Sequence, residues 1–436
     1  IDAVDVTPDN FGRIAAQTAK QVILQRIREA ERDMMFEEYQ DRVGELVTGI
    51  VQQSDSRYTL VQLRERVEAL LPRSEQVDGE RYDHGQRVKA VIKEVSASTK
   101  GPSIILSRRD PELIKSLFEL EVPEIAEGLV EASLRGIDTH GVRLFPTYLS
   151  ELDGGRSAAR PEFSWWGDRP AAVLLDAGHA LGLVAGKVAI EEVARRARSQ
   201  GVGAVAVRNS NHFGPASRYT LPLARQGLLG LAFSNSDALV APHGGVKPFF
   251  GTNPLSFAAL AEDGELLAID MATSQVAYSK IRQRRAEQAP LEAGWAVDSS
   301  GADAAQTGGD VSALKPLGGY KGECLGLMVE VLAALLVGEK FDHELTHLFD
   351  PPFDEPRHVS HLFLAIDPAA FGDPLAFRAR LTRLLALVRA QPSAPGERIL
   401  VPGDLEAESF RERSTLGIPL DERELSAFRK IDTEDD

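Results

Sequence analysis

A histidine lies in a short run of polar and glycine residues, Arg135-Gly-Ile-Asp-Thr-His-Gly-Val142. The ordinary pKa of histidine is the closest to neutrality of any side chain, so His140 suits proton transfer at physiological pH. Asp138 or Thr139 can orient its ring, and Gly141 lets backbone or ligand approach closely. The same turn is also typical of a structural histidine, so its function depends on what accompanies it.

A second histidine lies in Arg208-Asn-Ser-Asn-His-Phe-Gly214, directly after a predicted strand at 204–207. Open α/β sheets bind ligands at the carboxyl ends of their strands. The segment is dense in hydrogen-bonding groups, and loops carry chemistry more often than the elements they join. His212 is therefore a second candidate, and a solvated surface loop is the alternative.

Four further segments are rich in turn-forming or polar residues: 241–245, 251–254, 270–274 and 317–322. The first two can offer backbone N–H groups to a phosphate, or they are ordinary turns. Asp270 to Ser274 follows a predicted strand and can hold a ribose or phosphate, or cap a helix. Lys321 stands in a glycine-rich run before an apolar helix, where an anion would be favoured.

Three matches to known motifs fail on their context. Residues 201–206 have the letters of a dinucleotide fingerprint, but they follow a helix and precede a strand, the reverse of the required order. Residues 182–187 are one residue short of a phosphate-binding P-loop. His343 and His347 fit the zinc-protease pattern H-E-x-x-H, but Pro351 and Pro352 soon follow and no third ligand is evident. We predict no metal site.

The bulk properties favour a large soluble protein. A length of 436 residues allows two or three domains, and no apolar run is long enough for a membrane span. The first residues are acidic, unlike a signal peptide. The one cysteine, Cys324, excludes an internal disulfide and predicts a cytoplasmic protein. The net charge is −16, and residues 1–110, with 17 basic and 19 acidic side chains, contribute −2 of it, so nothing indicates nucleic acid from charge alone.

The hydrophobic pattern changes near residue 123. Before it, an apolar stripe after Asn10 predicts a long helix. Short β-rich runs then predict a small barrel, with strands at 45–51, 67–71, 87–95 and 103–107. After it, helices and strands alternate as in a large mixed α/β domain. We predict helices at 126–134, 188–199, 325–336 and 375–390, and strands at 204–207, 228–234, 266–269 and 361–366.

The first part resembles the bacterial transcription factor NusA over roughly residues 1–125. The matching segments are Phe11–Ile23, Val67–Pro72, Thr99–Pro102 and Leu117–Ile125. The resemblance implies a linker helix over 1–40 and an S1-like β-barrel over 41–110, which could bind RNA or RNA polymerase. The KH domains of that family do not follow. The barrel offers Tyr58 and Tyr82 for base stacking and no positive net charge, so a structural barrel is the favoured interpretation.

The motifs after residue 125, taken together, resemble the malate/L-lactate dehydrogenase type 2 family. They occur in the family's order and cover roughly residues 126–436. The segments that carry the resemblance are Leu134–Val142, Pro146–Tyr148, Asn209–Gly214, Pro242–Gly245, Gly251–Pro254, Asp270–Ser274, Pro316–Gly322 and Pro402–Gly403.

The resemblance implies an NAD(P)-dependent oxidoreductase that transfers a hydride between nicotinamide and a 2-hydroxy or 2-oxo acid. It implies an α/β, mixed-sheet, non-Rossmann fold over 111–436, preceded by a helix and a small S1/OB-like barrel, and a homodimer. His140 matches the family's acid/base histidine, Thr139 its neighbouring hydroxyl and His212 a second histidine near the substrate. The implied contacts to NAD or NADP are Phe213, Gly214, Asn253, Asp270, Met271, Ala272, Thr273, Ser274, Lys321, Gly403 and Asp404.

The substrate's carboxylate calls for an arginine, because a guanidinium binds a carboxylate with two parallel hydrogen bonds. Arg143 is the nearest candidate, and Arg135 is the next. Many relatives carry the arginine at the position of Leu144, which is a departure in this chain. The chain is therefore interpreted as a fusion of a barrel to a dehydrogenase, with RNA binding in transcription as the alternative function.

Overall fold

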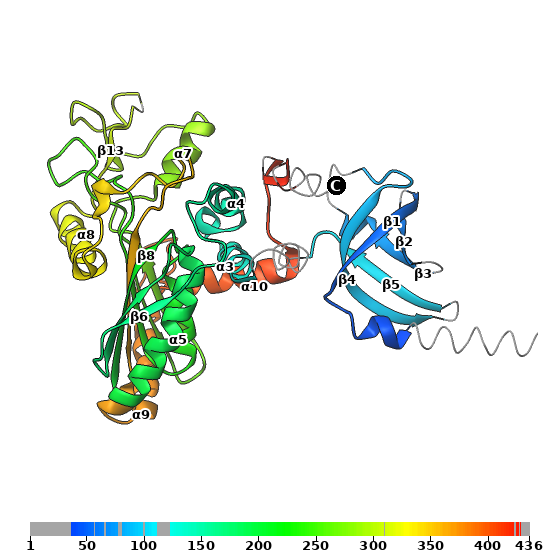
Figure 1. The fold of residues 1–436 in the computed structure, drawn as a ribbon, viewed down its shortest axis with the longest axis horizontal. Helices are drawn as coiled ribbons and strands as arrows, with labels where there is room; N and C mark the ends of the chain where they lie inside the picture. Colours follow the sequence, from blue (N-terminus) through cyan, green and yellow to red (C-terminus); the bar gives the residue numbers. More distant parts are fainter. Residues whose placement is uncertain are drawn as a thin grey trace, which may run out of the picture. The chain divides into compact units, whose positions relative to one another are not determined.

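The computed structural model describes residues 36–55, 57–64, 67–76, 81–98, 101–110, 123–308, 310–422, 424–426 and 428. The chain divides into two compact units, Ile1–Pro123 and Glu124–Asp436, and each is treated by itself (Figure 1). The helix predicted at 1–40 lies almost wholly outside the described residues. Within them, no helix is long and apolar enough to cross a membrane.

The first unit contains a closed five-stranded barrel with the strand order β1-β2-β3-β5-β4. All neighbouring pairs are antiparallel except β3 and β5, which are parallel. The predicted strands are present, and a strand that the sequence analysis did not predict, β2, completes the barrel. The strands are β1 (Leu46–Ser54), β2 (Tyr58–Arg64), β3 (Val67–Pro72), β4 (Arg87–Ser98) and β5 (Gly101–Ser107).

Alternate residues of the barrel strands point inward, as the two-residue period of a strand requires. Val88, Ala90 and Ile92 are buried in β4, as are Ile104 and Leu106 in β5. The same core buries Tyr82, while Tyr58 stays 38 % exposed. One of the two tyrosines considered for base stacking is therefore part of the packing.

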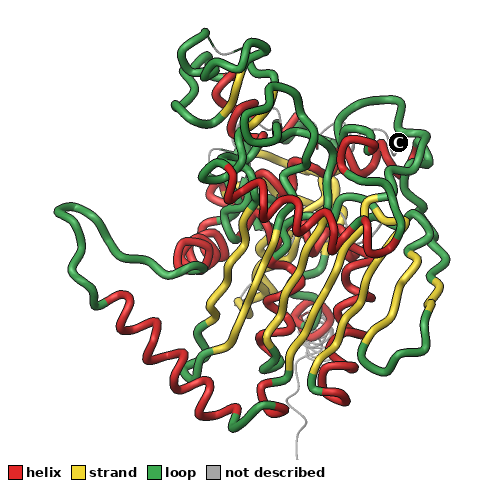
Figure 2. Tube along the Cα trace, turned by 90° about the vertical axis from the view of Figure 1, so that its left-hand side faces the viewer, coloured by secondary structure: helices red, strands yellow, loops and turns green. Residues whose placement is uncertain are grey.

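The second unit is built on a seven-stranded mixed sheet with the order β11-β10-β9-β14-β8-β7-β6. Figure 2 shows its strands lying side by side. β7 and β8 are parallel, and β14 runs antiparallel to both β8 and β9. The strands are β6 (Ser164–Trp166), β7 (Ala172–Asp176), β8 (Val202–Ser210), β9 (Leu229–Ser234), β10 (Leu255–Leu260), β11 (Leu266–Met271) and β14 (Val359–Ile366).

Helices cover both faces of this sheet, and strand alternation decides which side chains meet which helix. Val205 and Phe363 pack against α5 (Gly182–Gln200) and α6 (Ser217–Arg225). Their neighbours Ala206, Leu362 and Leu364 point the other way and pack against α8 (Tyr320–Ala333). Near β10, α9 (Pro374–Arg389) contributes Leu381 and Leu385 to a separate apolar cluster.

The remaining elements surround the ends of the sheet. In Figure 1, α7 and β13 lie beyond one end of the strands and α9 lies at the other. The elements not yet given are α3 (Pro123–Leu134), α4 (Phe145–Asp153), α7 (Tyr278–Ala286), the hairpin β12 (Ala296–Val297) and β13 (Ala313–Leu314), and α10 (Asp404–Leu416).

Both rejected nucleotide motifs lie where the sequence analysis placed them. Residues 182–187 form the first turns of α5, and residues 201–206 connect the end of α5 to β8. Neither is a strand–turn–helix phosphate loop. The α/β class and the mixed sheet, with no Rossmann motif, agree with the prediction.

Candidate active site

His140 and His212 lie together at one end of the large sheet, although 71 residues separate them in the sequence. Their rings stack with centroids 5.4 Å apart and planes inclined by 13°. His140 lies in a one-turn 3₁₀ helix, Asp138–His140, that follows α3. His212 lies two residues after β8, at the carboxyl end of that strand. The two sequence candidates thus form one site.

Each imidazole has a hydroxyl partner on Nδ1. Thr139 Oγ1 lies 2.8 Å from Nδ1 of His140. The hydroxyl of Tyr148 lies 2.6 Å from Nδ1 of His212. A hydrogen bond at Nδ1 fixes which tautomer the ring adopts and leaves Nε2 for a ligand. Of the two residues considered for orienting His140, Thr139 is thus the one in contact with its ring.

Burial holds both imidazoles in their neutral form. It lowers the pKa of His140 to about 4. The pKa of His212 is lowered well below its ordinary value, chiefly by burial and further by the neighbouring His140 and Arg357. Burial also raises the pKa of Tyr148, so its phenol stays protonated beside His212.

A small cavity of about 40 Å³ opens onto the two histidines. By volume it holds roughly three water-sized groups, so it can take a few atoms of a small molecule. The cavity is lined by His140, His212, Phe213, Gly214, Ser234, Asn235, Ser236, Thr252, Pro254, Arg357 and Val359. Phe213 and Gly214, both predicted, are thus beside the histidines.

His361, on β14, supports the aromatic wall of this cavity. It is fully buried between Ser234 Oγ, 2.8 Å from Nδ1, and Ser210 Oγ, 2.9 Å from Nε2. Its ring stacks on Phe213 at 4.6 Å with an inclination of 5°. Burial lowers the pKa of His361 to about 3, so the ring remains neutral at physiological pH.

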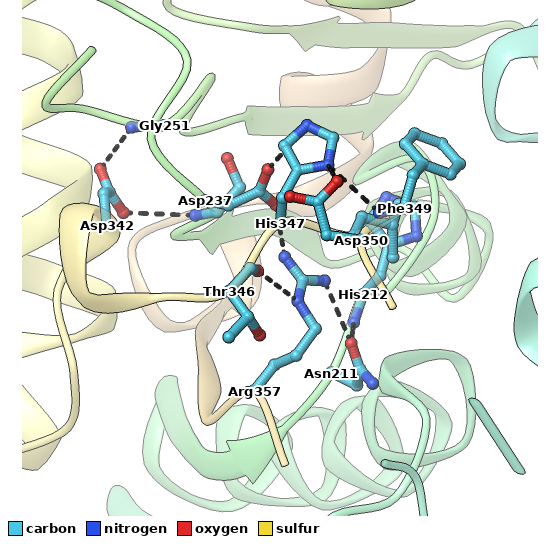
Figure 3. Close-up of polar contacts among 12 residues, drawn as sticks. Asn211, His212, Asp237, Gly251, Asp342, Thr346, His347, Phe349, Asp350 and Arg357 are labelled. Atoms are coloured by element: carbon cyan, nitrogen blue, oxygen red, sulfur yellow. Dashed lines mark hydrogen bonds and ion pairs between the residues drawn. The ribbon is translucent and has the colours of Figure 1, made fainter. Parts of the chain in front are cut away.

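Asn211 connects His212 to a buried polar network (Figure 3). Its Oδ1 accepts from the backbone N–H of His212 at 2.7 Å and from Nη1 of Arg357 at 3.2 Å. Its Nδ2 donates to Ser157 at 2.7 Å and to Glu151 at 3.1 Å. The backbone that carries His212 is therefore held from both sides of the Asn211 amide.

A larger cavity of about 700 Å³ lies near α7, and three of the predicted cofactor residues line it. Met271, Ala272 and Ser274 form one wall, with Leu317 beside them. The backbone N–H and hydroxyl of Thr273 donate to Thr252 O at 2.8 and 3.0 Å. Thr252 lines the small cavity, so these hydrogen bonds connect its wall to the residue between Ala272 and Ser274.

Other predicted cofactor residues have structural partners. Asp270 accepts from the backbone N–H of Ser217, the first residue of α6, at 2.8 Å. Asn253 is fully buried and donates to Asp342 at 2.7 Å, which also accepts from Gly251 N at 2.7 Å. Burial, with the neighbouring Glu330, raises the pKa of Asp342 to about 9. These contacts shape the loops that line the small cavity.

Lys321, Gly403 and Asp404 line neither cavity. Lys321 is exposed in the first turn of α8. Gly403 precedes α10, and Asp404 pairs with Arg389 at 2.6 Å. Their role in cofactor binding stays a prediction.

Asp138, Arg143 and Arg135 point elsewhere than the small cavity. The carboxylate of Asp138 pairs with Arg413 at 2.6 and 3.0 Å, so Asp138 orients α10 rather than His140. The Arg143 side chain is 43 % exposed and pairs with Glu424 at 3.2 Å. Burial lowers the pKa of Arg135, and the charges that act on it are those of Glu131, Glu406, Arg225 and Asp270. None of the three lines the cavity beside His140.

Sequence reasoning missed Tyr148, His361 and Arg357. Tyr148 had a signal, since it closes the segment Pro146–Tyr148 that carries the resemblance. His361 lies in a strand that was predicted, but a buried histidine in an apolar strand gives no functional pattern. Arg357 had no signal, because its partners Asn211 and Asp237 lie 146 and 120 residues away.

The H-E-x-x-H residues do not form a metal centre. His343 lies in a one-turn 3₁₀ helix and stacks on Phe249, while His347 lies beyond that helix beside Asp237. Among the described residues, no group of three or more His, Cys, Asp or Glu side chains is placed to hold a metal ion.

A seven-stranded mixed sheet with two stacked neutral histidines at one end offers a site for proton transfer. The sequence model of the malate/L-lactate dehydrogenase family matches residues 119–429. The chain belongs to this family and is an NAD(P)-dependent 2-hydroxyacid dehydrogenase.

Three relatives illustrate the similarity. An NAD(+) ureidoglycolate dehydrogenase of Escherichia coli O157:H7 is 33 % identical over 68 % of this chain and 84 % of its own. An NADP(+) (2R)-3-sulfolactate dehydrogenase of Chromohalobacter salexigens is 36 % identical over 68 % of this chain and 86 % of its own. The structure of malate dehydrogenase from Pyrococcus horikoshii OT3 superposes with a TM-score of 0.68 at 28 % identity, covering 75 % and 95 %.

The front of the chain matches two other families. Residues 2–33 match the NusA N-terminal domain, and residues 40–109 match the S1 RNA-binding domain. The fusion predicted from the sequence is therefore confirmed.

Proposed function

We propose that the small cavity carries out the reaction, with His140 as the acid/base for a 2-hydroxy or 2-oxo acid. The observation that supports this most is the stacking of two buried, neutral imidazoles over one cavity. A general base must be unprotonated at the working pH and within reach of the proton that it takes. Burial meets the first requirement for His140.

The Nδ1 partners give the two histidines different tasks. The protonated Tyr148 donates to Nδ1 of His212, so Nε2 of His212 carries the hydrogen and can donate to a substrate oxygen. His140 donates Nδ1–H to Thr139 and keeps a lone pair on Nε2. In the oxidation direction Nε2 of His140 accepts the hydroxyl proton, and in the reduction direction the same atom returns it.

The large cavity fits a nicotinamide dinucleotide by the chemistry of its lining. Lys280 offers positive charge for phosphates, Gln275 offers an amide for a ribose, and Trp295 offers a flat apolar surface. Arg284 lines the same cavity and pairs with Glu292 at 3.2 Å. Met271, Ala272 and Ser274 would hold the cofactor on the wall nearest Thr252. When bound, NAD or NADP accepts or supplies the hydride.

Turnover of a panel of 2-oxo acids with NADH and NADPH tests the function. We expect the full chain to oxidise one of the two cofactors with at least one acid. His140→Gln should lower kcat by about a hundredfold or more, the usual contribution of a positioned acid/base. His84→Gln is the matched control, because His84 is exposed in the barrel.

Two results would contradict the proposal. One is no turnover of any 2-oxo acid by the folded protein. The other is full activity of His140→Gln with an unchanged circular dichroism spectrum. An equal loss of kcat in His140→Gln and His84→Gln would show that the loss does not come from the acid/base role of His140.

We also propose a homodimer in the cytoplasm, as the family resemblance and the lone Cys324 imply. The outer face of α8 supports the dimer, because it exposes an apolar stripe at helical spacing. The stripe consists of Tyr320, Leu327, Met328 and Val331, each 41–58 % exposed. Such stripes on a folded protein mark contact surfaces.

The S1 match supports RNA binding only weakly. S1-like barrels bind single strands through exposed aromatics and a positive groove. In this barrel Tyr82 is buried and Tyr58 is exposed, and residues 1–110 carry no net positive charge. RNA or RNA polymerase is therefore a second candidate partner, with less support than the small acid.

A further inference from the structure

The substrate's carboxylate lacks a cation in the places where the sequence suggested one. Arg143 is 43 % exposed and pairs with Glu424. Among the described residues that line the small cavity, Arg357 alone carries a permanent positive charge. It lies just before β14, which places it at the same end of the sheet as His212.

The Arg357 side chain is 1 % exposed and firmly held (Figure 3). Nε donates to Thr346 O at 3.0 Å, Nη1 donates to Asn211, and Nη2 forms an ion pair with Asp237. A guanidinium has five N–H groups. These contacts use one on each nitrogen, so one N–H remains on Nη1 and one on Nη2.

The positive charge of Arg357 is felt throughout the site. It contributes to the lowered pKa of His212 and acts against the raised pKa values of Tyr148 and Glu151. Its counter-ion Asp237 is itself shared, since Nε2 of His347 lies 3.5 Å from the second carboxylate oxygen.

We propose that Arg357 binds the carboxylate of the 2-hydroxy or 2-oxo acid, with Asp237 as the residue that positions its guanidinium. This rests on the function proposed above and assigns its substrate contact. The remaining N–H groups on the two terminal nitrogens match the two oxygens of a carboxylate. Bound there, the acid lies in the same cavity as the Nε2 atoms of His140 and His212.

The proposal gives the H-E-x-x-H segment a task. His347 is its second histidine, and its Nδ1 accepts the backbone N–H of Phe349 at 3.2 Å, which leaves the hydrogen on Nε2, the atom nearest Asp237 (Figure 3). His347 thus braces the carboxylate that orients Arg357.

Binding of oxamate, an unreactive 2-oxo acid mimic, to the full chain with NADH measures this contact without turnover. We expect Arg357→Lys to raise the Kd of oxamate and the KM of the acid by tenfold or more, because lysine cannot form the forked pair. The matched control is Arg156→Lys, since Arg156 is equally buried but donates to the carbonyls of residues 347, 348, 350 and 352.

Asp237→Asn separates substrate binding from a purely structural role of the pair. The variant keeps Arg357 and a side-chain oxygen that can still accept from Nη2 and position the guanidinium, and it removes only the negative charge that offsets the attraction to the substrate, so we expect the Kd of oxamate to fall or stay level. A structural pair predicts weaker binding for both Arg357→Lys and Asp237→Asn. Isothermal titration calorimetry and thermal melting of each variant provide the data.

The outcomes also separate this inference from the proposed function. Wild-type turnover with an unchanged oxamate Kd and KM in folded Arg357→Lys overturns the inference and leaves the function standing. Weaker binding in Asp237→Asn, equal to that in Arg357→Lys, overturns it as well. Failure of the wild-type chain to reduce any 2-oxo acid overturns the proposed function itself.

Discussion

The chemistry of this site depends on burial, which sets the protonation of its histidines. His140 and His212 lie 5.4 Å apart, and two imidazolium ions at that distance would repel each other in a poorly solvated cavity. Keeping both neutral avoids that cost. In the proposed mechanism, the hydrogen bonds of Thr139 and Tyr148 at Nδ1 leave a lone pair on Nε2 of His140 and a hydrogen on Nε2 of His212.

The lowered pKa of His140 predicts an unusual pH profile. Oxidation needs the neutral ring, and because its pKa is about 4, kcat/KM for the hydroxy acid should be flat from pH 6 to 8. Reduction needs the protonated ring, so its kcat/KM should rise roughly tenfold for each pH unit from 8 to 5. An ordinary histidine would instead give a bend near pH 6.5 in both directions.

Initial rates in both directions, at saturating cofactor, measure the profile. A bend near pH 6.5 in kcat/KM for oxidation would show that His140 titrates as an exposed histidine. Circular dichroism at each pH confirms that the protein is folded, because buried neutral histidines lose stability as the pH falls from about 6.5 toward their folded pKa values.

At the scale of elements, the site residues lie at the carboxyl ends of β8 and β9 and at the amino end of β14. Asn211 and His212 follow β8, Asp237 follows β9, and Arg357 precedes β14. The antiparallel pairing of β14 with both strands places Val359 opposite Ser210 and His361 opposite Ser234. The register that pairs these three strands therefore also brings the polar loops at their ends together.

The amino end of α5 fixes the segment that carries His212. Gly182 donates its N–H to His212 O at 3.1 Å, and a Cβ on Gly182 would lie 2.3 Å from Asn211 O and 2.6 Å from Phe213 Cβ. Gly182→Ala should cost about 1–3 kcal/mol of stability, lowering Tm by several degrees. The displaced His212 should lower kcat by about tenfold or more.

Thermal melting and steady-state kinetics check this expectation against Gly372→Ala. A Cβ on Gly372 would meet no atom within 4 Å, so this variant should melt and turn over like the wild type. Equal behaviour of Gly182→Ala and Gly372→Ala would show that α5 does not position His212.

The sequence was enough to predict the elements whose period is regular and the motifs that occur in family order. Predicted strands at 204–207, 228–234, 266–269 and 361–366 are present as β8, β9, β11 and β14. The helix predicted at 188–199 begins earlier, at Gly182. The prediction missed its first turns because the two glycines there lower helix propensity. Packing demands those glycines, since a Cβ on Gly186 would lie 2.2 Å from the Tyr219 ring.

Long-range contacts account for what the sequence could not predict. Arg143 stands beside the motif of His140 in the sequence, yet it pairs with Glu424. Arg357 is remote in sequence and lines the cavity, because β14 returns to the centre of the sheet between β8 and β9. Proximity in the sequence therefore favoured Arg143, which does not line the cavity, whereas the sheet topology brings Arg357 to it.

At the scale of the whole molecule, two units with separate cores lie on one chain. The barrel buries its own alternating residues, and the dehydrogenase unit has its own clusters on both faces of the sheet. The family match begins at residue 119 and the compact second unit at Glu124. Site residues of both cavities lie within that second unit, so the proposed chemistry requires nothing from the barrel.

The second unit carries a surface that a second copy can cover. On the inner face of α8, Gly326 and Val329 are buried, with Thr273 the closest neighbour of a Cβ built on Gly326. On its outer face Leu327 and Val331 remain 49 % and 46 % exposed. A dimer formed through the outer face of α8 would therefore hold the helix that packs on Thr273 of the proposed cofactor segment. We expect dimer formation to affect cofactor binding for this reason.

Val331→Glu tests the dimer, because a buried carboxylate without a partner is costly at an interface. With a chain mass of 47.4 kDa, the wild type should sediment at twice that mass and the variant at the mass of one chain, with a raised KM for the cofactor. Leu384→Glu on α9, 55 % exposed in the wild type, is the matched control and should remain dimeric. A monomeric wild type at micromolar concentration, or a Val331→Glu dimer, would assign the stripe another role, because a stable interface buries about 1,200–2,000 Å² and does not tolerate a charge at its centre.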